Sequence, residues 1–413
     1  MAILKGIYKF FSSFLLAAIV LILLTIVTLA GTLAQKEMGL HGGVKEFFHS
    51  YKFSVFDASP FGGTIFGKPI LIPLPGGMTL MIILFINMTL GGLVHVRKRA
   101  RGVPNLIIHS GMLFLLVSGF ITHKMKRDGY VALYPGSSTN RAQSYKDWQI
   151  EVYELDENDA AKKATVIPWE NLKPIGDEGS QVFTSKEWPF SVKVENFYRN
   201  ARPLPTSAPI SAEATGPEIN GFKLLRRETE KEVAANFPGC FATILPSDEA
   251  EGVGTIILSG TSDRISPDDS AMMAEFDFAS KKWGIQLVKR SWEIAFDIEL
   301  EKFIFEKHPG TTKAKNFESR IIWKENPEDE GKKVAVRMND PMRQSGFVVF
   351  QESYGPPNPR PGEQMYSQFA VSDDPADYFP LIALTIITIG LAAHFIWRLA
   401  EYISKSGAKR RTA

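Results

Sequence analysis

The sequence predicts a membrane protein of the mixed α and β class, with four transmembrane helices and one large β-rich domain outside the cytoplasm. Two observations predict this fold class. Uncharged apolar segments occupy both ends of the 413-residue chain, three near the N-terminus and one near the C-terminus. Between them, residues 124–378 are polar and contain short runs rich in Val, Ile, Phe and Tyr. A region of this length can bury a hydrophobic core of its own.

The four apolar segments are each long enough to cross a bilayer as a helix. They span residues 14–34, 71–95, 102–123 and 379–397, and none contains Asp, Glu, Lys or Arg. A helix rises about 1.5 Å per residue, so about 20 residues cover a hydrocarbon core of about 30 Å. The first segment exceeds the apolar region of a signal peptide, which is about 7–15 residues long. We therefore interpret it as a retained membrane anchor.

Basic residues beside these segments predict their orientation. Lys5 and Lys9 precede the first segment, and the turn at residues 96–101 and the tail at residues 398–413 are both basic. With four spans these regions share one side of the membrane, and their excess of Lys and Arg marks that side as cytoplasmic.

The predicted localisation is a multi-pass protein of the cell (inner) membrane with both termini in the cytoplasm. The loop at residues 35–70 and the domain at residues 124–378 are then periplasmic or extracytoplasmic. Lys124, Lys126 and Arg127 lie on that outer side. They lead into a long domain, however, and such domains translocate largely regardless of charge.

Six segments of the middle region predict the strands of a β-sandwich-like or irregular antiparallel domain. They are rich in β-branched and aromatic residues, and several alternate apolar with polar positions. These segments span residues 149–155, 190–197, 254–260, 296–306, 333–338 and 346–354. Proline-rich stretches at residues 200–220 and 355–363 predict loops.

Composition and motifs exclude several classes of function. The net charge is only +2, so the basic face of a nucleic-acid-binding protein is not expected. Cys240 is the single cysteine, which excludes an internal disulfide, a CxxC redox motif, a CxxCH haem-attachment motif and a cysteine-based zinc site. We expect Cys240 to be buried as a small hydrophobic residue. No GxSxG nucleophile motif is present.

Histidine is the residue type that points most directly to a function. Four of the seven histidines lie in or beside the apolar segments, namely His95, His109, His123 and His394. Ionisable side chains inside a membrane are costly and often functional, and histidine is a common axial ligand of haem iron. His109 is the deepest in its segment and is the first candidate ligand. His95 and His394 lie near the cytoplasmic ends of their segments and could approach it at one depth.

The spacing of His109 and His123 is also informative. They are 14 residues apart, which brings them to within about 40° of the same helix face, about 21 Å apart along the axis. One helix would then present a histidine near each membrane surface. By contrast, we expect His41, His49 and His308, which lie in predicted loops, to be ordinary surface residues.

Residues around the third apolar segment resemble a known family. The run GVPNLIIHSGMLFLLVSGFIT (102–122), followed by DGYVALYPGSSTN (128–140), is similar to the ResB (CcsB) proteins of the System II pathway of cytochrome c biogenesis. In that family a Gly-x-x-x-x-His-x-Gly run opens a span. Here Gly102 is placed slightly differently, Asp128 replaces one family Glu, and Pro135 stands where a second Glu is usual.

A second matching region precedes the last apolar segment. The stretch MNDPMRQSGFVVFQESYG (338–355) resembles the family pattern N-x-P-L-x-x-x-G-Y-x-F-Y-Q-x-S-Y, with Met342 in place of Leu. The matching residues are Asn339, Pro341, Gly346, Phe350, Gln351, Ser353 and Tyr354. Blocks at residues 305–321 and at the N-terminus follow the same family order, whereas residues 150–290 match only in character.

The resemblance implies a specific role. Family members work with a ResC (CcsA) membrane partner that carries a tryptophan-rich WWD segment, and together they deliver haem b to the CxxCH motif of apocytochrome c. This chain has no WWD segment, so the partner would be a separate protein. The resemblance assigns haem ligation to His109, with haem iron as the only metal, and the partner would supply the second axial ligand. The chain would be a non-catalytic or co-catalytic subunit of a cytochrome c haem lyase.

Two other functions remain open from the sequence. One is a b-type cytochrome that transfers electrons, because a 14-residue histidine spacing is typical of its haem-binding helices. No second segment has two histidines at this spacing. The residue 14 positions before His95 is Met81, and the residue 14 positions before His394 is Pro380. The other is a structural subunit that anchors a partner and binds no haem.

Overall fold

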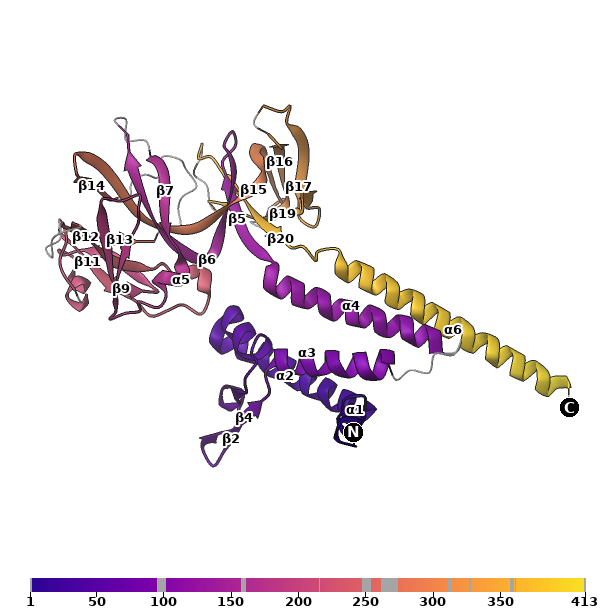
Figure 1. The fold of residues 1–413 in the computed structure, drawn as a ribbon. Helices are drawn as coiled ribbons and strands as arrows, with labels where there is room; N and C mark the ends of the chain where they lie inside the picture. The colour runs from indigo at the N-terminus through magenta and orange to yellow at the C-terminus, as the bar shows by residue number, and fades with distance from the viewer. Residues whose placement is uncertain are drawn as a thin grey trace. The chain divides into compact units, whose positions relative to one another are not determined.

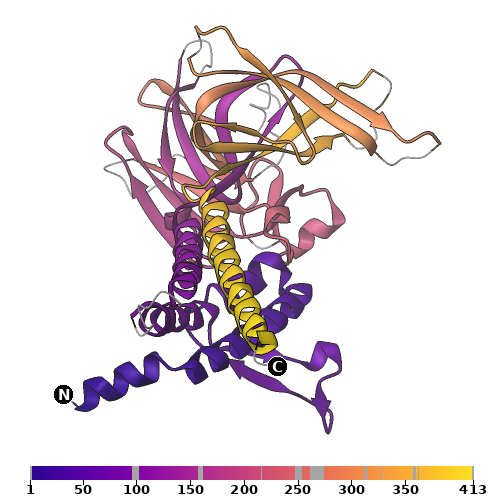
Figure 2. The same cartoon turned by 90° about the vertical axis from the view of Figure 1, so that its right-hand side faces the viewer.

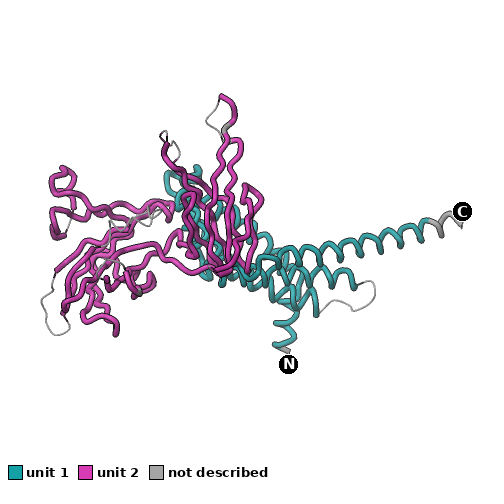
Figure 3. Tube along the Cα trace, turned by 90° about the horizontal axis from the view of Figure 1, so that it is seen from above, with its two compact units in different colours: residues 1–126, 374–413 teal, residues 127–373 magenta. Residues whose placement is uncertain are grey.

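The structure is a computed structural model that divides the chain into two compact units. It describes residues 2–94, 102–156, 161–214, 216–246, 254–260, 274–310, 314–326, 328–356, 360 and 362–411. One unit comprises residues 1–126 and 374–413, and the other comprises residues 127–373 (Figure 3). The first is helical and the second is built of strands, so each is described separately.

The helical unit contains four helices that are long and apolar enough to cross a membrane, counted within the described residues. This agrees with the predicted fold class, which has four apolar helices. The four are α2 (Phe14–Gly43), α3 (Gly77–Asn87), α4 (Val103–Met125) and α6 (Phe379–Arg411), with α2 continued by the π-helical stretch η1 (Val44–Phe48) and α3 by the π-helical stretch η3 (Met88–Val94) (Figure 1). The shorter helix α1 (Ala2–Phe11) precedes them.

The second span begins later than the sequence pattern indicated. Residues Leu71–Leu74 form strand β4, which pairs with β1 (Ser54–Asp57), and the helix starts at Gly77. Pro73 and Pro75 account for this difference, because proline lacks a backbone donor and disfavours the helical conformation of the residue before it. The small hairpin β2 (Thr64–Ile65) and β3 (Lys68–Pro69) occupies the same loop.

Other boundaries also differ from the predicted segments. Helix α2 runs on through residues 35–43, which were expected in a loop, with a kink at Gly39. Residues 2–11 of the predicted tail form α1, and α6 continues past Trp397 as far as Arg411. Ser13 separates α1 from α2 and caps α2, since its Oγ accepts a hydrogen bond of 3.1 Å from the Leu16 amide.

Helices α4 and α6 lie side by side (Figures 1 and 2), and small residues allow their close approach. A Cβ added at Gly111 of α4 would lie 2.7 Å from Cγ1 of Ile387, and one at Gly390 of α6 would lie 2.7 Å from Cγ1 of Ile108. Small residues at helix contacts are typical of membrane bundles, where close backbone packing drives association. Thr122 also donates a 3.0 Å hydrogen bond to Asp374 near the start of α6.

The second unit is made of antiparallel strands. The strands are β5 (Arg127–Leu133), β6 (Ser138–Leu155), β7 (Ala161–Ile167), β8 (Ser180–Thr184), β9 (Phe190–Tyr198), β10 (Ala201–Pro205), β11 (Phe222–Arg226), β12 (Gly239–Pro246), β13 (Gly254–Ser259), β14 (Ala274–Phe278), β15 (Lys281–Lys307), β16 (Ala314–Lys324), β17 (Lys332–Arg337), β18 (Met342–Gln344), β19 (Phe347–Gly355) and β20 (Tyr366–Asp373). All six predicted strand segments lie within or largely overlap one of these strands. The β-rich fold class is therefore confirmed.

Two sheets account for most of this unit. The larger one has the order β17-β16-β15-β6-β5-β20-β19-β18, with β14 and β7 pairing at its side, and the smaller one has the order β13-β12-β9-β8. The edge strands β17 and β18 of the larger sheet are consecutive in the chain and joined by a short turn with backbone hydrogen bonds between Arg337 and Asp340. Because its two edges meet there, the sheet curls back on itself.

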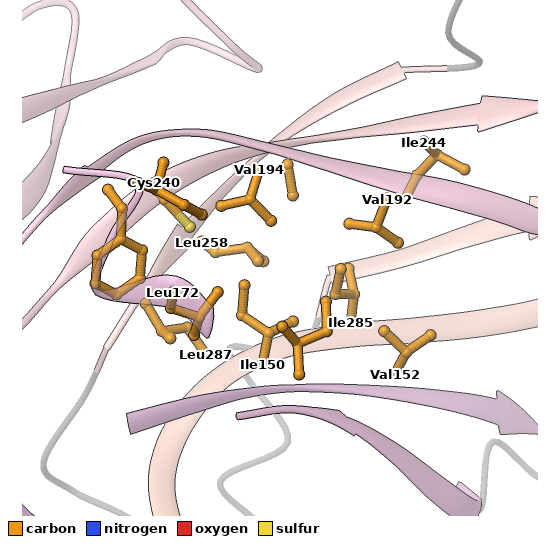
Figure 4. Close-up of a cluster of buried hydrophobic side chains, with 14 of the residues drawn as sticks. Ile150, Val152, Leu172, Val192, Val194, Cys240, Ile244, Leu258, Ile285 and Leu287 are labelled. Atoms are coloured by element: carbon orange, nitrogen blue, oxygen red, sulfur yellow. The ribbon is translucent and has the colours of Figure 1, made fainter. Parts of the chain in front are cut away.

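The unit has two main hydrophobic cores. One lies between the smaller sheet and the second half of β6 with the first half of β15, and includes Ile150, Val192, Cys240 and Ile285 (Figure 4). Cys240 is fully buried there, as expected for a single cysteine that serves as a small hydrophobic residue. The other core fills the curled part of the larger sheet and is built around residues such as Phe296.

One predicted loop was wrong in part. Residues 201–205 of the proline-rich stretch 200–220 form β10, which pairs with β11 through the register Ala201–Arg226 to Pro205–Phe222. Prolines at positions 203 and 205 are tolerated because this ribbon has only two strands, and a proline can face away from its single partner. The stretch 355–363 contains no strand after Gly355 within its described residues.

Candidate functional site

His109 lies on α4 with its ring held in one orientation. Its Nδ1 is 2.8 Å from the backbone carbonyl oxygen of Asn105, one turn earlier in the helix. A carbonyl oxygen can only accept a hydrogen bond, so Nδ1 carries the proton and donates it. The lone pair of the neutral imidazole then resides on Nε2. Protein histidines that bind a metal are commonly held in this way, with the second nitrogen donating to a carbonyl or carboxylate.

The ring of His109 packs against Gly92 of η3. A Cβ added at Gly92 would lie 2.9 Å from Cδ2 and 3.0 Å from Cγ of His109, so only glycine leaves room for the ring here. Residue 92 belongs to a π-helical stretch, and such stretches are uncommon and are frequent at functional sites. The tertiary fold thus gives His109 a defined position that neither helix provides alone.

Of the other predicted ligands near the cytoplasmic side, only His394 is among the described residues, and it does not join His109. His95 lies outside the described residues. His394 lies on α6, one turn beyond the contact of Gly390 with Ile108, and its ring meets the edge of Phe395. Among the described residues, no hydrogen bond or ring contact links His394 with His109. The face of α4 that meets α6 includes Gly111, nearly opposite the face that carries His109.

His123 has a partner that the sequence did not indicate. Its ring lies beside that of His49, with centroids 4.1 Å apart and an angle of 56° between the planes. His49 directly follows η1, and its amide donates to the Val44 carbonyl at 2.9 Å. The two histidines are 74 residues apart in the chain, so no local pattern could have paired them. His49, expected to be an ordinary surface residue, stands beside one of the predicted ligands.

An apolar cavity lies next to this histidine pair. It has a volume of about 510 Å³ and is lined by α2, η1, α3 and α4, with His49 and His123 among its lining residues. Most other lining side chains are aliphatic, aromatic or thioether groups, including Met81, Phe85 and Phe120. The volume falls within the range of about 300–1,000 Å³ that is typical of small-molecule sites. We call it the His123 cavity.

The residues of the 339–354 motif build the fold around one hairpin. Asn339 has a φ of 67° in the turn between β17 and β18, a left-handed conformation that Asn tolerates better than most residues. Ser345 and Gly346, with φ of 49° and 85°, form the two-residue turn between β18 and β19. Positive φ at both positions is characteristic of a type I′ hairpin turn. Pro341 lies between these turns, immediately before β18.

Gln351 of the motif forms a buried polar network across three strands. Its Oε1 accepts a 2.5 Å hydrogen bond from Ser319 of β16, and its Nε2 donates to Ser367 of β20 at 2.8 Å. Nε2 also donates to the backbone carbonyl of Ser353 at 3.1 Å. Ser319 and Ser367 are fully buried and also share a 2.8 Å hydrogen bond between their hydroxyls, so the three side chains satisfy one another inside the protein.

Tyr354 completes the motif as part of an aromatic cluster. Its ring centroid lies 4.7 Å from Phe305, 5.6 Å from Phe317 and 5.7 Å from Phe303. The matched motif residues therefore serve to hold β16, β19 and β20 together. None of these contacts forms a site for chemistry, and we interpret the motif as structural.

Metal sites based on clustered side chains are not found in the described part of the chain. No group of three or more His, Cys, Asp or Glu residues there is placed to hold a metal ion. This result does not exclude His109 or His123 as a haem ligand, because the haem ring itself supplies four nitrogen ligands to the iron and the protein needs to supply only one or two.

Comparison with known families agrees with the resemblance seen in the sequence. Residues 269–363 match the model of the ResB-like family, which corresponds to the region from β14 to the end of β19 and includes the 339–354 motif. The match does not extend to α4, so the role of His109 rests on its own geometry. Comparison with curated proteins gave no match. The chain is thus similar to the ResB-like family over residues 269–363 and has four helices apolar enough to cross a membrane, which points to the general context of cytochrome c biogenesis.

Proposed function

We propose that this protein is a subunit of a membrane complex that transports haem b and attaches it to apocytochrome c. In this proposal His109 is an axial ligand of the haem iron within the membrane. The chain lies in the cell (inner) membrane with both termini in the cytoplasm, and the β-rich unit is periplasmic. The complex uses a ResC (CcsA)-type partner with a WWD segment, which this chain lacks.

The observation that carries the proposal is the hydrogen bond from His109 Nδ1 to the Asn105 carbonyl. It fixes the tautomer that coordinates iron through Nε2, and the contact with Gly92 holds the ring in place. Iron coordinated by a neutral imidazole gains a ligand without a charged protein group, which suits a site inside a membrane. Bound haem would supply the iron centre and the vinyl groups that the attachment reaction consumes.

The position of His394 supports a partner-supplied second ligand. His394 faces Phe395 and has no described contact with His109. With Gly92 against one part of the His109 ring, haem would have to approach from the remaining side. A histidine from the partner could reach the opposite face of such a haem. Haem shared between two chains is easier to release than haem enclosed by one, because separation of the chains removes a ligand.

Haem content of the complex tests this proposal directly. The chain would be purified with its ResC-like partner as wild type, as His109→Gly and as the matched control His394→Gly, and the Soret absorbance per complex would be compared. We expect His109→Gly to lose most of the haem and added imidazole to restore it, because free imidazole fits the space vacated by the side chain. His394→Gly should retain haem.

Three outcomes would contradict the proposal in different ways. Unchanged haem in His109→Gly would remove this residue as a ligand. Absence of haem from the wild-type complex would favour a structural subunit that anchors a partner. Tight haem with a reversible redox potential in the isolated chain would instead favour an electron-transferring b-type cytochrome.

A further inference from the structure

We propose that the His123 cavity binds an isoprenoid quinone, with the imidazole of His123 as the hydrogen-bonding partner of a quinone oxygen. The inference concerns a ligand other than haem and a place other than His109, so it does not depend on the proposed function. It starts from two observations that neither the 339–354 motif nor His109 explains. One is the apolar cavity of about 510 Å³ between helices, and the other is the imidazole of His49, whose centroid lies 4.1 Å from that of His123.

The cavity reaches a surface of the helical unit that lipid would surround. Three of its lining side chains, Ile82, Phe85 and Phe120, are exposed, and they belong to α3 and α4, two of the helices apolar enough to cross a membrane. Gly119 on α4 is also exposed and lines the cavity, and a Cβ added there would meet no atom within 4 Å. A ligand that enters from this side must therefore be soluble in the bilayer.

The charge of the lining restricts the ligand further. The described lining residues include no Asp, Glu, Lys or Arg. A charged group that is buried without a partner of opposite charge is costly. The phosphate of a lipid head group and the carboxylate of a fatty acid are therefore poor occupants, and the lining favours a neutral molecule.

Aromatic and thioether side chains form much of the wall. Phe48, Phe85 and Phe120 contribute aromatic rings, and Met78 and Met81 contribute polarisable sulfur atoms. Both kinds of side chain pack favourably against a flat π system. The lining therefore suits a ligand that contains a planar ring.

The imidazole of His123 offers a polar contact that a hydrocarbon chain could not use. Its side chain is partly buried, and within the described part of the chain neither of its ring nitrogens has a hydrogen-bond partner. In a neutral imidazole one nitrogen donates and the other accepts, so the ring can bind a quinone carbonyl or a quinol hydroxyl. His49 packs on this ring, and we assign it as a positioning residue.

The cavity has the same division into polar and apolar ends as a quinone. His123 lies in the last turn of α4, where the span ends, whereas Leu116 and Phe120 line the cavity at positions further into the span. An isoprenoid quinone likewise has a planar head with two oxygen atoms and a long apolar tail. Its head would contact His123 near the membrane surface, and its tail would leave past Gly119 into the bilayer.

Equilibrium binding of a quinone to the full-length chain tests the site. A radiolabelled decyl-tailed benzoquinone is added to the chain in phosphatidylcholine nanodiscs, and empty nanodiscs measure its simple partition into lipid. The variant His123→Phe removes the ring nitrogens and keeps a ring of similar size, and Gly119→Leu fills the cavity. The matched controls are His394→Phe and Gly6→Leu, because neither residue is among the described lining residues and a Cβ at Gly6 also meets nothing within 4 Å.

We expect saturable binding at a single site for wild type and for both controls. His123→Phe should weaken binding about tenfold, which corresponds to the loss of one hydrogen bond, and Gly119→Leu should abolish the saturable part. A decyl-tailed benzene, which has the ring and the tail but no oxygen atoms, should compete about tenfold more weakly than unlabelled quinone for the same reason. This last comparison uses wild type alone, so it holds even if a variant does not fold.

Four results would overturn the proposal. Binding to wild type no greater than to empty nanodiscs would show that there is no site. Equal competition by the decyl-tailed benzene would show a hydrocarbon site that a lipid chain fills. Unchanged binding in His123→Phe, or saturable binding that persists in Gly119→Leu, would show that the quinone binds elsewhere. Each of these results leaves haem ligation by His109 untouched, because haem content is measured separately.

Discussion

The imidazole of His109 occupies the space that Gly92 leaves by having no side chain. The two residues come from consecutive helices, and a Cβ at position 92 would lie within 3.0 Å of two ring atoms. On the other side of the ring, the bond from Nδ1 to the Asn105 carbonyl sets the tautomer. The position of the ring therefore depends on residues from both helices.

Substitution of Gly92 tests how strongly this packing supports haem binding. We expect Gly92→Ala to weaken haem binding by about 10–100-fold, the range seen when a residue that orients a metal ligand is changed. The added methyl group displaces the ring while leaving Nε2 chemically intact. Haem content of the complex would be measured by absorbance, with Gly6→Ala as the control because nothing lies near its Cβ. Equal haem in both variants would argue against a positioning role for Gly92.

The contact of α4 with α6 predicts a loss of stability from overpacking. Gly111→Val would push a side chain toward Ile387 and the Ala383 carbonyl, 2.7 and 3.1 Å from the new Cβ. We expect a cost of about 1–3 kcal/mol, seen as a lower thermal midpoint in detergent. Gly119→Val on the same helix is the control, since it carries the same helix propensity but meets open space. Matching midpoints for the two variants would contradict close packing of α4 on α6.

The buried network of Gln351 predicts a penalty for removing its amide. In Gln351→Leu, Ser319 and Ser367 keep the 2.8 Å hydrogen bond between their hydroxyls but each loses its bond to Gln351, and the buried hydrogen-bonding capacity left unused costs about 1–3 kcal/mol. Denaturant unfolding of the β-rich unit within the full chain would measure the loss. Gln368→Leu, which removes only a contact with the exposed Glu352 at 3.0 Å, should cost clearly less. A larger loss in the Gln368 variant would refute the structural role of the motif.

The buried thiol of Cys240 predicts both low reactivity and a pH effect. Burial raises the pKa of Cys240 above its usual range, so the folded protein keeps the neutral thiol. Above the ordinary thiol pKa of about 8.5 the unfolded chain loses a proton that the folded protein retains, and stability falls as pH rises. Maleimide should label Cys240 only after unfolding. In Cys240→Ala the stability should decrease less as pH rises, because the thiol is absent. Rapid labelling of the native protein would show that the thiol is not enclosed.

Lys289 predicts the opposite pH dependence. Burial lowers the pKa of Lys289 to about 8, although the negative charge of Asp147 acts to raise it. The Nζ of Lys289 donates a 2.7 Å hydrogen bond to the Tyr145 carbonyl and lies 4.2 Å from the centroid of the Trp148 ring. Between about pH 8 and the ordinary lysine pKa of about 10.4, the unfolded chain holds a proton that the folded one has lost. This residue therefore makes stability rise with pH across that window.

The variant Lys289→Met isolates this contribution. Its stability relative to wild type should fall by up to about 3 kcal/mol between pH 7 and pH 11, because each pKa unit corresponds to about 1.4 kcal/mol. Urea unfolding at several pH values would measure the difference. Lys282, which is only partly buried and forms an ion pair with Glu275 at 2.8 Å, gives the control Lys282→Met, for which we expect no such trend. A difference that stays constant with pH would show that Lys289 keeps an ordinary pKa.

Local patterns predicted much of the architecture because hydrophobicity has a fixed period in each element. Uncharged runs identified the four spans, and β-branched runs identified strands such as β9 and β19. Boundaries were less predictable. Leu71–Leu74 are as apolar as the helix that follows, and they become strand β4 because β1 is available to pair with them. Likewise β10 forms within a proline-rich stretch because β11 supplies its partner.

The sequence by itself determined the class of the protein, its spans, its single buried cysteine and His109 as the first candidate ligand. These depend on composition and on the distance between neighbours along one element. Only the tertiary structure showed that the ring of His109 packs against Gly92 and that His49 lies beside His123 next to a cavity. The reason is physical: helices bring together residues far apart in the chain, and which faces meet depends on side-chain volumes along the whole contact.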